Sequence, residues 1–497
     1  MESFGTITNF YPFLSEKTRE IVESVLSESE GYDDFVKRLV DLILVQKETD
    51  DLTYFTTLHA WISSEPVTFD RLRPRLLGDV VLKPWSYWDF KGPSEEFRHS
   101  YKQALESSPE SWVRLHLLIL GVIFQPEQYE RQKALEESKE LVESEPELIC
   151  FSAENHVRQG WFDRFAADIK GAMNNFQKAQ KIAERCDDVI ISLEAQCELA
   201  GCLKESDVFQ ALSLLEDAYQ TFKSIGANYW ASIKAGDMGL LHTIIGEYDL
   251  AVEFYLEADQ FAESSVWDRQ AHAYVFARIY CDIDLPEDSL EWIKNFMDWE
   301  DLTPEIMESL PEYSTRYVSL ALARTLIEMN RLEGVSQLLD KTHKLILETG
   351  RDDQLLDFNY VNGLFEVAFG NLSAGLQSMA DALAEAERLE YQVHVNDILL
   401  SLAKAELKYF DKLGSGGPES SGPWMTRLGI HAQERNYPGI RMQHALLKAE
   451  YQEMIGETEA AVLTLQDALT FTDSPGVKTL RKRILDRLKE LETPVDA

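Results

Sequence analysis

Few residues in this 497-residue chain have the types and spacing that catalysis requires. The chain contains neither the GxxxxGK[ST] loop that holds phosphates nor the HExxH helix that binds zinc. Glycines lie within 414–417, but that loop lacks the lysine of a phosphate cradle. His394 and Asp397 share one predicted helix face, yet no serine or cysteine nucleophile can be tied to them. We therefore expect no catalytic residues and no enzymatic activity.

Two clusters come nearest to a metal site. Cys197 and Cys202 are five residues apart rather than at CxxC spacing, and no second pair accompanies them. Asp282, Asp284 and Asp288 have the spacing of a calcium loop but lack its glycine and its closing glutamate. Buried thiols and a negatively charged helix N-terminus explain both clusters, so we expect no metal and no cofactor.

The formal net charge is −38, from 86 acidic and 48 basic residues. Such a surface repels nucleic-acid phosphates and anionic lipid, which predicts no nucleic-acid partner and favours a basic protein partner. A generally acidic or salt-adapted proteome would explain the charge equally well. Basic residues do crowd 478–489, where we expect a solvated helix face paired with acidic neighbours. The alternative for this segment is docking of an acidic partner or a second copy of the chain.

The composition indicates a globular protein of the cytoplasm. Hydrophobic residues make up 45% of the chain, which suffices for a continuous core. No stretch reaches the roughly 18 apolar residues of a membrane span, so no membrane insertion is expected. The first residues show no basic segment leading into an apolar one, and a secretory signal is not expected. Five cysteines in so long a chain predict no disulfide framework, which fits a reducing compartment.

The elements that must position any site are predicted from a recurring pattern of small residues. Two small residues stand twelve apart, a bulky residue follows the second at +4, and alanine follows it at +7. The pattern occurs at Gly160/Ala172, Gly239/Ala251, Gly363/Gly375 and Ala449/Ala461. Where two helices cross closely, one must carry a small residue opposite a large one on its partner. The pattern therefore predicts stacked helical hairpins.

The hairpins recur about every 40 residues, which is a helical-repeat period. Gly246, Gly370 and Gly456 lie between the two helices of their hairpins, where a left-handed cap favours glycine. No stretch alternates long enough to predict a strand, so the chain is expected to be all-α. We expect a divergent, mostly helical N-terminal cap at 1–107, an array of about eight helix pairs at 108–473, and a capping helix with a short tail at 474–497. A flexible loop is expected at 413–423.

The hairpin pattern resembles the tetratricopeptide repeat (TPR) family. The copy with Gly239, Gly246, Tyr248, alanine at 251, tyrosine at 255 and alanine at 258 matches that family nearly position for position. The resemblance covers roughly 109–473 and departs from the family in its longer period. It implies a right-handed α-solenoid of stacked antiparallel helix pairs that serves as a platform for protein–protein contact.

In such arrays the first helix of each pair lines the concave face. The resemblance therefore implies a set of groove-facing residues here: Trp161, Arg164, Tyr274, Arg278, Tyr317, Arg324, Asp357, Tyr360 and Gln443. Tyrosine and arginine are the residue types that often anchor interfaces, although packing between helices would explain each position as well.

These observations predict a non-catalytic scaffold or adaptor that binds a protein or peptide in its concave groove. The alternative is a sensory or regulatory module that binds a small ligand and transmits the event by a change of solenoid curvature. An enzymatic role would depend wholly on residues 1–107. The identity of the partner and the oligomeric state stay open.

Overall fold

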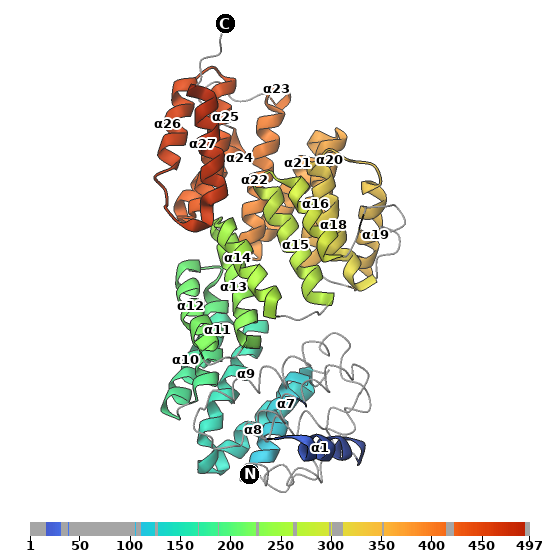
Figure 1. The fold of residues 1–497 in the computed structure, drawn as a ribbon, viewed down its shortest axis with the longest axis vertical. Helices are drawn as coiled ribbons and strands as arrows, with labels where there is room; N and C mark the ends of the chain where they lie inside the picture. Colours follow the sequence, from blue (N-terminus) through green and yellow to red (C-terminus); the bar gives the residue numbers. More distant parts are fainter. Residues whose placement is uncertain are drawn as a thin grey trace. The chain divides into compact units, whose positions relative to one another are not determined.

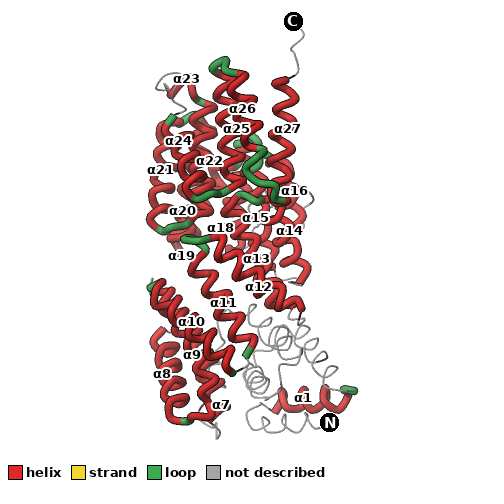
Figure 2. Tube along the Cα trace, turned by 90° about the vertical axis from the view of Figure 1, so that its left-hand side faces the viewer, coloured by secondary structure: helices red, strands yellow, loops and turns green. Residues whose placement is uncertain are grey.

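A computed structural model describes most of the chain beyond residue 110. The described residues are 16–30, 38, 105, 111–124, 128–166, 168–186, 188–224, 228–261, 266–297, 300, 312–349, 352–413 and 422–492. Most of the predicted N-terminal cap at 1–107 lies outside them, as do residues 414–421 of the predicted loop. Every described element is a helix, and no strand occurs in these ranges (Figure 2). The predicted all-α class is confirmed.

The chain divides into two compact units, residues 1–234 and 235–497. The helices of the first unit are α1 (Glu16–Glu28), α7 (Ser111–Phe124), α8 (Gln128–Ser144), η3 (Pro146–Phe151), α9 (Ser152–Phe165), α10 (Ile169–Arg185), α11 (Val189–Leu203) and α12 (Val208–Ser224). Helix α13 (Asn228–Ile245) continues from the first unit into the second.

The second unit holds the remaining helices (Figure 1). They are α14 (Tyr248–Phe261), α15 (Val266–Asp282), α16 (Pro286–Phe296), α18 (Glu312–Glu328), α19 (Val335–Thr349), α20 (Asp352–Phe369), α21 (Leu372–Arg388), α22 (Gln392–Lys408), α23 (Phe410–Leu413), α24 (Pro423–Glu434), α25 (Pro438–Met454), α26 (Thr458–Ala468), η4 (Pro475–Val477) and α27 (Lys478–Glu492). Consecutive helices pack against each other as in a stack of hairpins.

The predicted close crossing of paired helices is confirmed. A Cβ built on Gly160 of α9 would lie 2.5 Å from the ring of Phe176 on α10. Likewise, a Cβ on Gly363 of α20 would lie 2.7 Å from the side chain of Met379 on α21. A larger residue at either glycine would push the two helices of its pair apart. The bulky residue at +4 thus fills the space that the small residue leaves.

The helix ends follow from local sequence. Gly246 and Gly370 adopt φ of +78° and +106°, the left-handed conformation predicted for the turns after α13 and α20. At helix starts, Asp168 accepts a hydrogen bond from the Gly171 N–H at 2.9 Å, which satisfies one unpaired donor of the first turn of α10. These caps keep the loops between paired helices short.

One covalent link was not predicted. Cys150 and Cys186, 36 residues apart, form a disulfide with a Cα–Cα distance of 5.8 Å. It joins η3 to the C-terminal end of α10 within the first unit. The sequence predicted no disulfide framework and did not indicate this pair, because the stacking of hairpins brings together ends that the sequence separates. Cys197, Cys202 and Cys281 are buried and take part in no disulfide.

In the second unit the array curls back on itself. The turn after α13 meets the start of α25, where Gly246 and Gly439 pass backbone to backbone. Asn396 of α22 donates a hydrogen bond to the Ile244 carbonyl at 2.7 Å, and Tyr248 donates to Gln443 Oε1 of α25 at 3.2 Å. Helices α22 and α25 therefore contact the chain near residue 245.

Helix α27 completes the unit against these same segments. Its residues Leu480, Ile484 and Leu488 are buried, and the hydroxyl of Thr479 donates to Asp249 Oδ1 of α14 at 2.6 Å. Among the described helices, none combines the length with the apolar composition needed to cross a bilayer.

Candidate functional site

The two predicted groove residues of the first unit contact neighbouring side chains on α9 and α11. The Arg158 guanidinium lies 4.1 Å from the ring centre of Trp161, and it forms a buried ion pair with Glu194 of α11 at 2.7 Å. Arg164 pairs with Glu198 of α11 at 2.6 Å. Trp161 and Arg164 therefore lie where α9 packs on α11.

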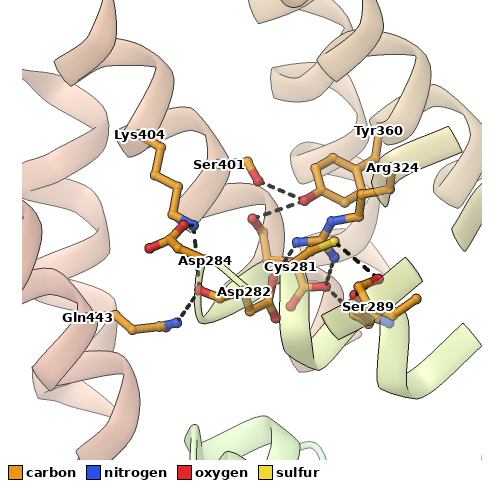
Figure 3. A network of polar contacts seen from close by, with 12 residues as sticks. Cys281, Asp282, Asp284, Ser289, Arg324, Tyr360, Ser401, Lys404 and Gln443 are labelled. Carbon is orange, nitrogen blue, oxygen red and sulfur yellow. Dashed lines mark hydrogen bonds and ion pairs between the residues drawn. The ribbon is translucent and has the colours of Figure 1, made fainter. Parts of the chain in front are cut away.

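The predicted groove residues of the second unit either belong to a buried network of charged and hydroxyl groups or lie around it. We call it the polar hub, and it consists of Arg278 and Asp282 of α15, Arg324 of α18, Tyr360 of α20, and Asp397 and Ser401 of α22. Figure 3 labels Asp282, Arg324, Tyr360 and Ser401. The residue exposures are 1% for Asp282, 5% for Arg324 and 3% for Asp397. Four helices thus place polar side chains together in the protein interior.

The contacts of the hub centre on one carboxylate. Asp397 forms ion pairs with Arg278 and with Arg324, the second at 3.3 Å between Nη1 and Oδ2. Arg324 also pairs with Asp282. The Tyr360 hydroxyl lies 2.7 Å from Ser401 Oγ, so α20 is joined to α22.

The remaining predicted residues surround the hub. The Tyr274 and Tyr317 rings meet edge to face, with centroids 5.6 Å apart. Asp357 Oδ1 lies 2.8 Å from the Nε2 of His394. Gln443 donates from Nε2 to the Asp282 carbonyl at 2.8 Å. The structure therefore gathers all seven predicted residues of this unit, but it engages them with other side chains and backbone groups of the same unit. Their partner-binding role, like that of Trp161 and Arg164, stays a prediction.

Burial governs the electrostatics of the hub. It raises the pKa of the Asp397 carboxyl to about 7, and nearby Asp282 adds to that rise, whereas Arg278 and Arg324 oppose it. The desolvation of such charges offsets much of their attraction, but loss of one partner leaves the others buried and unpaired. The hub is therefore better suited to bracing α15, α18, α20 and α22 than to meeting a ligand directly.

Next to the hub lies a cleft of about 440 Å³, which we call the α25–α27 cleft. From α22 and α25 it is lined by Leu400, Lys404, Gln443, Leu446, Leu447 and Glu450. From α27 and the turn between α15 and α16 it is lined by Arg483, Asp486, Arg487, Glu490, Asp282 and Asp284. Of the predicted groove residues, Gln443 alone is among this lining.

One end of the cleft is held by a charged clamp. Asp284, with φ of +57°, stands at the turn between α15 and α16. Its carboxylate forms ion pairs with Lys404 of α22 and with Arg483 of α27, the latter at 2.5 Å (Figure 3 shows the Lys404 contact). Although burial opposes it, Lys404 and Arg483 hold the pKa of Asp284 below its ordinary value. The clamp fixes the turn against two helices that are distant in sequence.

Sequence reasoning missed Lys404 and Glu450 as cleft residues. Lys404 is a lone cation between the buried residues Ala403 and Ala405 of an apolar helix, and that anomaly could have marked it. Its partner Asp284 lies 120 residues earlier and shares no local pattern with it. The basic segment 478–489 does pair with acidic residues, as expected, but partners such as Asp284 and Glu453 lie on other elements.

The histidine, serine and cysteine side chains near the hub are not arranged as a base and a nucleophile. His394 contacts Asp357, whereas Ser401, two turns further along α22, contacts Tyr360. Burial raises the pKa of the Cys281 thiol to about 11, so it is protonated at neutral pH, and thiolate is the reactive form. Within the described residues, no group of three or more His, Cys, Asp or Glu side chains is placed to hold a metal ion.

Comparison with known proteins concerns the fold. No family model matches the chain, and no curated protein matches it. Among solved structures, the chain is similar to the human IFIT1 dimer with PPP-AAAA, at 12% identity and a TM-score of 0.35. The match covers 79% of this chain and 84% of the other. The TPR-like helical-repeat fold rests on the hairpins described above.

This comparison contradicts one prediction. The net charge of −38 led us to exclude a nucleic-acid partner, yet the helical-repeat neighbour was solved with the RNA ligand PPP-AAAA. Net charge averages over the whole surface, whereas binding depends on the potential at one site. The exclusion is therefore withdrawn.

Proposed function

We propose that this chain is a non-catalytic scaffold of TPR-like helix pairs that binds a protein or peptide partner in the α25–α27 cleft. The observation that carries the proposal is the cleft itself. Its volume is about 440 Å³, and its lining comes from α22, α25, α27, the end of α15 and the turn that follows α15. A preformed cleft of this size can receive a side chain or a short segment of a partner.

We further propose that the array belongs to a long-period class of the TPR family. The first helices of successive pairs begin at Ser152, Val189, Asn228, Val266, Glu312, Asp352, Gln392 and Pro438. Their spacing of 37 to 46 residues exceeds the 34 residues of the common repeat. The longer period supports longer helices within the same hairpin plan.

The polar hub and the Asp284 clamp support the scaffold role because they stiffen the walls of the cleft. Gln443 joins α25 to Asp282 of the hub, and the clamp joins α22 and α27 to the same turn. A wall that is already rigid loses less conformational entropy when a partner binds. Residues of the hub would thus support partner binding without touching the partner.

Site-specific crosslinking tests this function. A photoreactive residue would be introduced as Leu446→p-benzoylphenylalanine on the cleft wall, and as Leu463→p-benzoylphenylalanine on α26, where Leu463 is 66% exposed and lies outside the cleft lining. We expect one defined polypeptide to crosslink at 446 in native extract and not at 463. That polypeptide, once purified, should bind the wild-type chain.

The same two positions then provide matched binding variants. Leu446→Trp should weaken binding of the captured polypeptide by at least about tenfold, since the larger side chain fills part of the cleft, whereas Leu463→Trp should leave binding unchanged. Equal crosslinking at both positions, or equal affinity of both variants, would refute partner binding in this cleft.

A second candidate function is a sensor of a small ligand. The cleft volume falls within the roughly 300–1,000 Å³ that is usual for small-molecule sites. In this case no polypeptide would crosslink at 446. Instead, a metabolite would raise the midpoint of thermal unfolding by several degrees, and Leu446→Trp would abolish that rise.

A further inference from the structure

The carboxylates that line the α25–α27 cleft are unequally engaged. Asp284 is held by Lys404 and Arg483, Glu490 pairs with Arg487, and Asp486 pairs with Lys489. By contrast, none of the described residues forms an ion pair with Glu450. The cleft therefore offers at least one carboxylate with acceptor capacity to spare.

Asp282 adds negative charge to the wall of the cleft but no acceptor that a ligand can reach. This residue is 1% exposed and lines the cleft. Its Oδ1 pairs with Arg324 in the polar hub, its Oδ2 is buried, and its backbone carbonyl accepts a hydrogen bond from Gln443. The exposed side chain of Glu450 is therefore the carboxylate that is open to a cationic ligand.

The cationic side chains that line the cleft, by contrast, are all ion-paired. Lys404 and Arg483 both contact Asp284, and Arg483 donates a further hydrogen bond to the Ile283 carbonyl at 3.0 Å. The Arg487 guanidinium contacts both Glu453 and Glu490. Every cationic side chain in the cleft lining thus has a carboxylate already. An anionic ligand would have to break these pairs, whereas a cationic ligand would not.

We propose that the α25–α27 cleft binds the cationic side chain of a lysine or arginine on a protein partner, an inference that rests on the scaffold function proposed above. The ammonium or guanidinium group is received by the carboxylate of Glu450. Leu400, Leu446 and Leu447 line the same cleft and contact the aliphatic stem.

The charge of the whole chain favours the same class of partner. A net charge of −38 attracts cations over long range and speeds their encounter with the surface. Long-range attraction does not select one place, however. The selectivity comes from a concave site that combines unpaired carboxylate oxygens with an apolar wall.

Methyl NMR on the full chain tests the proposal at the site itself. The leucine methyl groups would be isotope-labelled and those of Leu446 and Leu447 assigned with Leu→Ile variants. The probe is Nα-acetyl-lysine methylamide, and its Nε-acetylated form is the neutral match. We expect the charged probe to shift these two residues with saturation, and the neutral probe to leave them in place. A capped glutamate probe should also have no effect.

The matched variants are Glu450→Gln and Glu459→Gln, the latter at an exposed position of α26 outside the cleft. Glu450→Gln should weaken the lysine probe about tenfold, as expected for loss of one charged hydrogen bond, while Glu459→Gln should change its affinity less than twofold. Equal shifts with the neutral probe, shifts with the glutamate probe instead, or an unchanged affinity in Glu450→Gln would overturn the assignment.

The two proposals fail in different ways. If a polypeptide crosslinks at 446 but the lysine probe does not bind, the scaffold function stands and the cationic partner is wrong. If the lysine probe binds in the cleft but no polypeptide crosslinks there, the cleft recognises a cation and the scaffold function is wrong.

Discussion

The backbones of Gly246 and Gly439 touch, although one ends α13 and the other begins α25. A Cβ built on Gly439 would lie 1.9 Å from the Gly246 carbonyl oxygen, and one built on Gly246 would lie 2.7 Å from the nitrogen of Ile440. Backbone atoms cannot move aside as a flexible side chain can. This contact sets how closely the array of the second unit curls back on itself.

Gly439→Ala should therefore destabilise the protein by roughly 1–3 kcal/mol, since the added methyl group overpacks a backbone contact. The matched control is Gly236→Ala in the interior of α13, where a Cβ meets no atom within 4 Å. That change should stabilise by about 0.5–1 kcal/mol, because alanine is the better helix former. Urea denaturation of both variants measures the difference, and an equal effect at both positions would show the contact to be absent.

Arg324→Met should cost about 3–5 kcal/mol of stability, because it leaves Asp282 without its ion-pair partner and Asp397 with Arg278 alone. Glu348→Gln serves as the control, as it removes only an exposed pair with Lys344 on α19. We expect the control to lose less than about 1 kcal/mol. Chemical denaturation at pH 8 gives both values, and a loss below about 1 kcal/mol for Arg324→Met would contradict the bracing role of the hub.

Acid should destabilise the fold partly through His431. Burial, with Arg435 and Arg427 adding to it, lowers the pKa of this imidazole from 6.5 to about 4. Between these two values the unfolded chain binds a proton that the folded chain does not, so stability falls as the pH falls. His431→Gln removes the group that binds this proton. The free energy of unfolding of the variant, relative to that of wild type, should therefore rise by up to about 1.4 kcal/mol per pH unit as the pH is lowered from 6.5 to 4. A difference that is constant with pH would rule out a neutral buried His431.

Thiol counting should separate the five cysteines into two classes. Cys197, Cys202 and Cys281 are buried, and burial raises the pKa of the Cys281 thiol, so we expect no reaction of these three with Ellman's reagent in the native protein. In guanidinium chloride without reductant, three thiols should react, and after reduction all five. Five reactive thiols before reduction would show that Cys150 and Cys186 are not paired in the isolated protein.

The helix pairs could be predicted because their signals are local. The small residue at Gly160 and the bulky residue at Phe176 lie 16 residues apart, and one hairpin brings them together. The same holds for the turn at Gly246, whose left-handed backbone requires glycine wherever the hairpin stands in the array. Periodicity and turn chemistry therefore sufficed for the all-α class and for the TPR-like repeats.

The candidate site could be predicted only in part. The first helix of each pair was expected to line the concave face, which led to the prediction of Arg278, Arg324 and Gln443. The structure does bring these residues together. It did not show that their side chains would be engaged inside the chain, because sequence carries no measure of how far an array closes on itself. Lys404 and Glu450 were missed for the same reason.

The sequence by itself determined which segments form helices and which face of each helix packs on its neighbour, since both depend on contacts within one hairpin. Only the tertiary structure decided that Asp284 meets Lys404 and Arg483, and that Glu450 lines the same cleft. The physical reason is that rotations between helix pairs accumulate along the array. Each helix pair adds a small rotation to the stack, and the sum over several pairs determines which distant charges lie side by side.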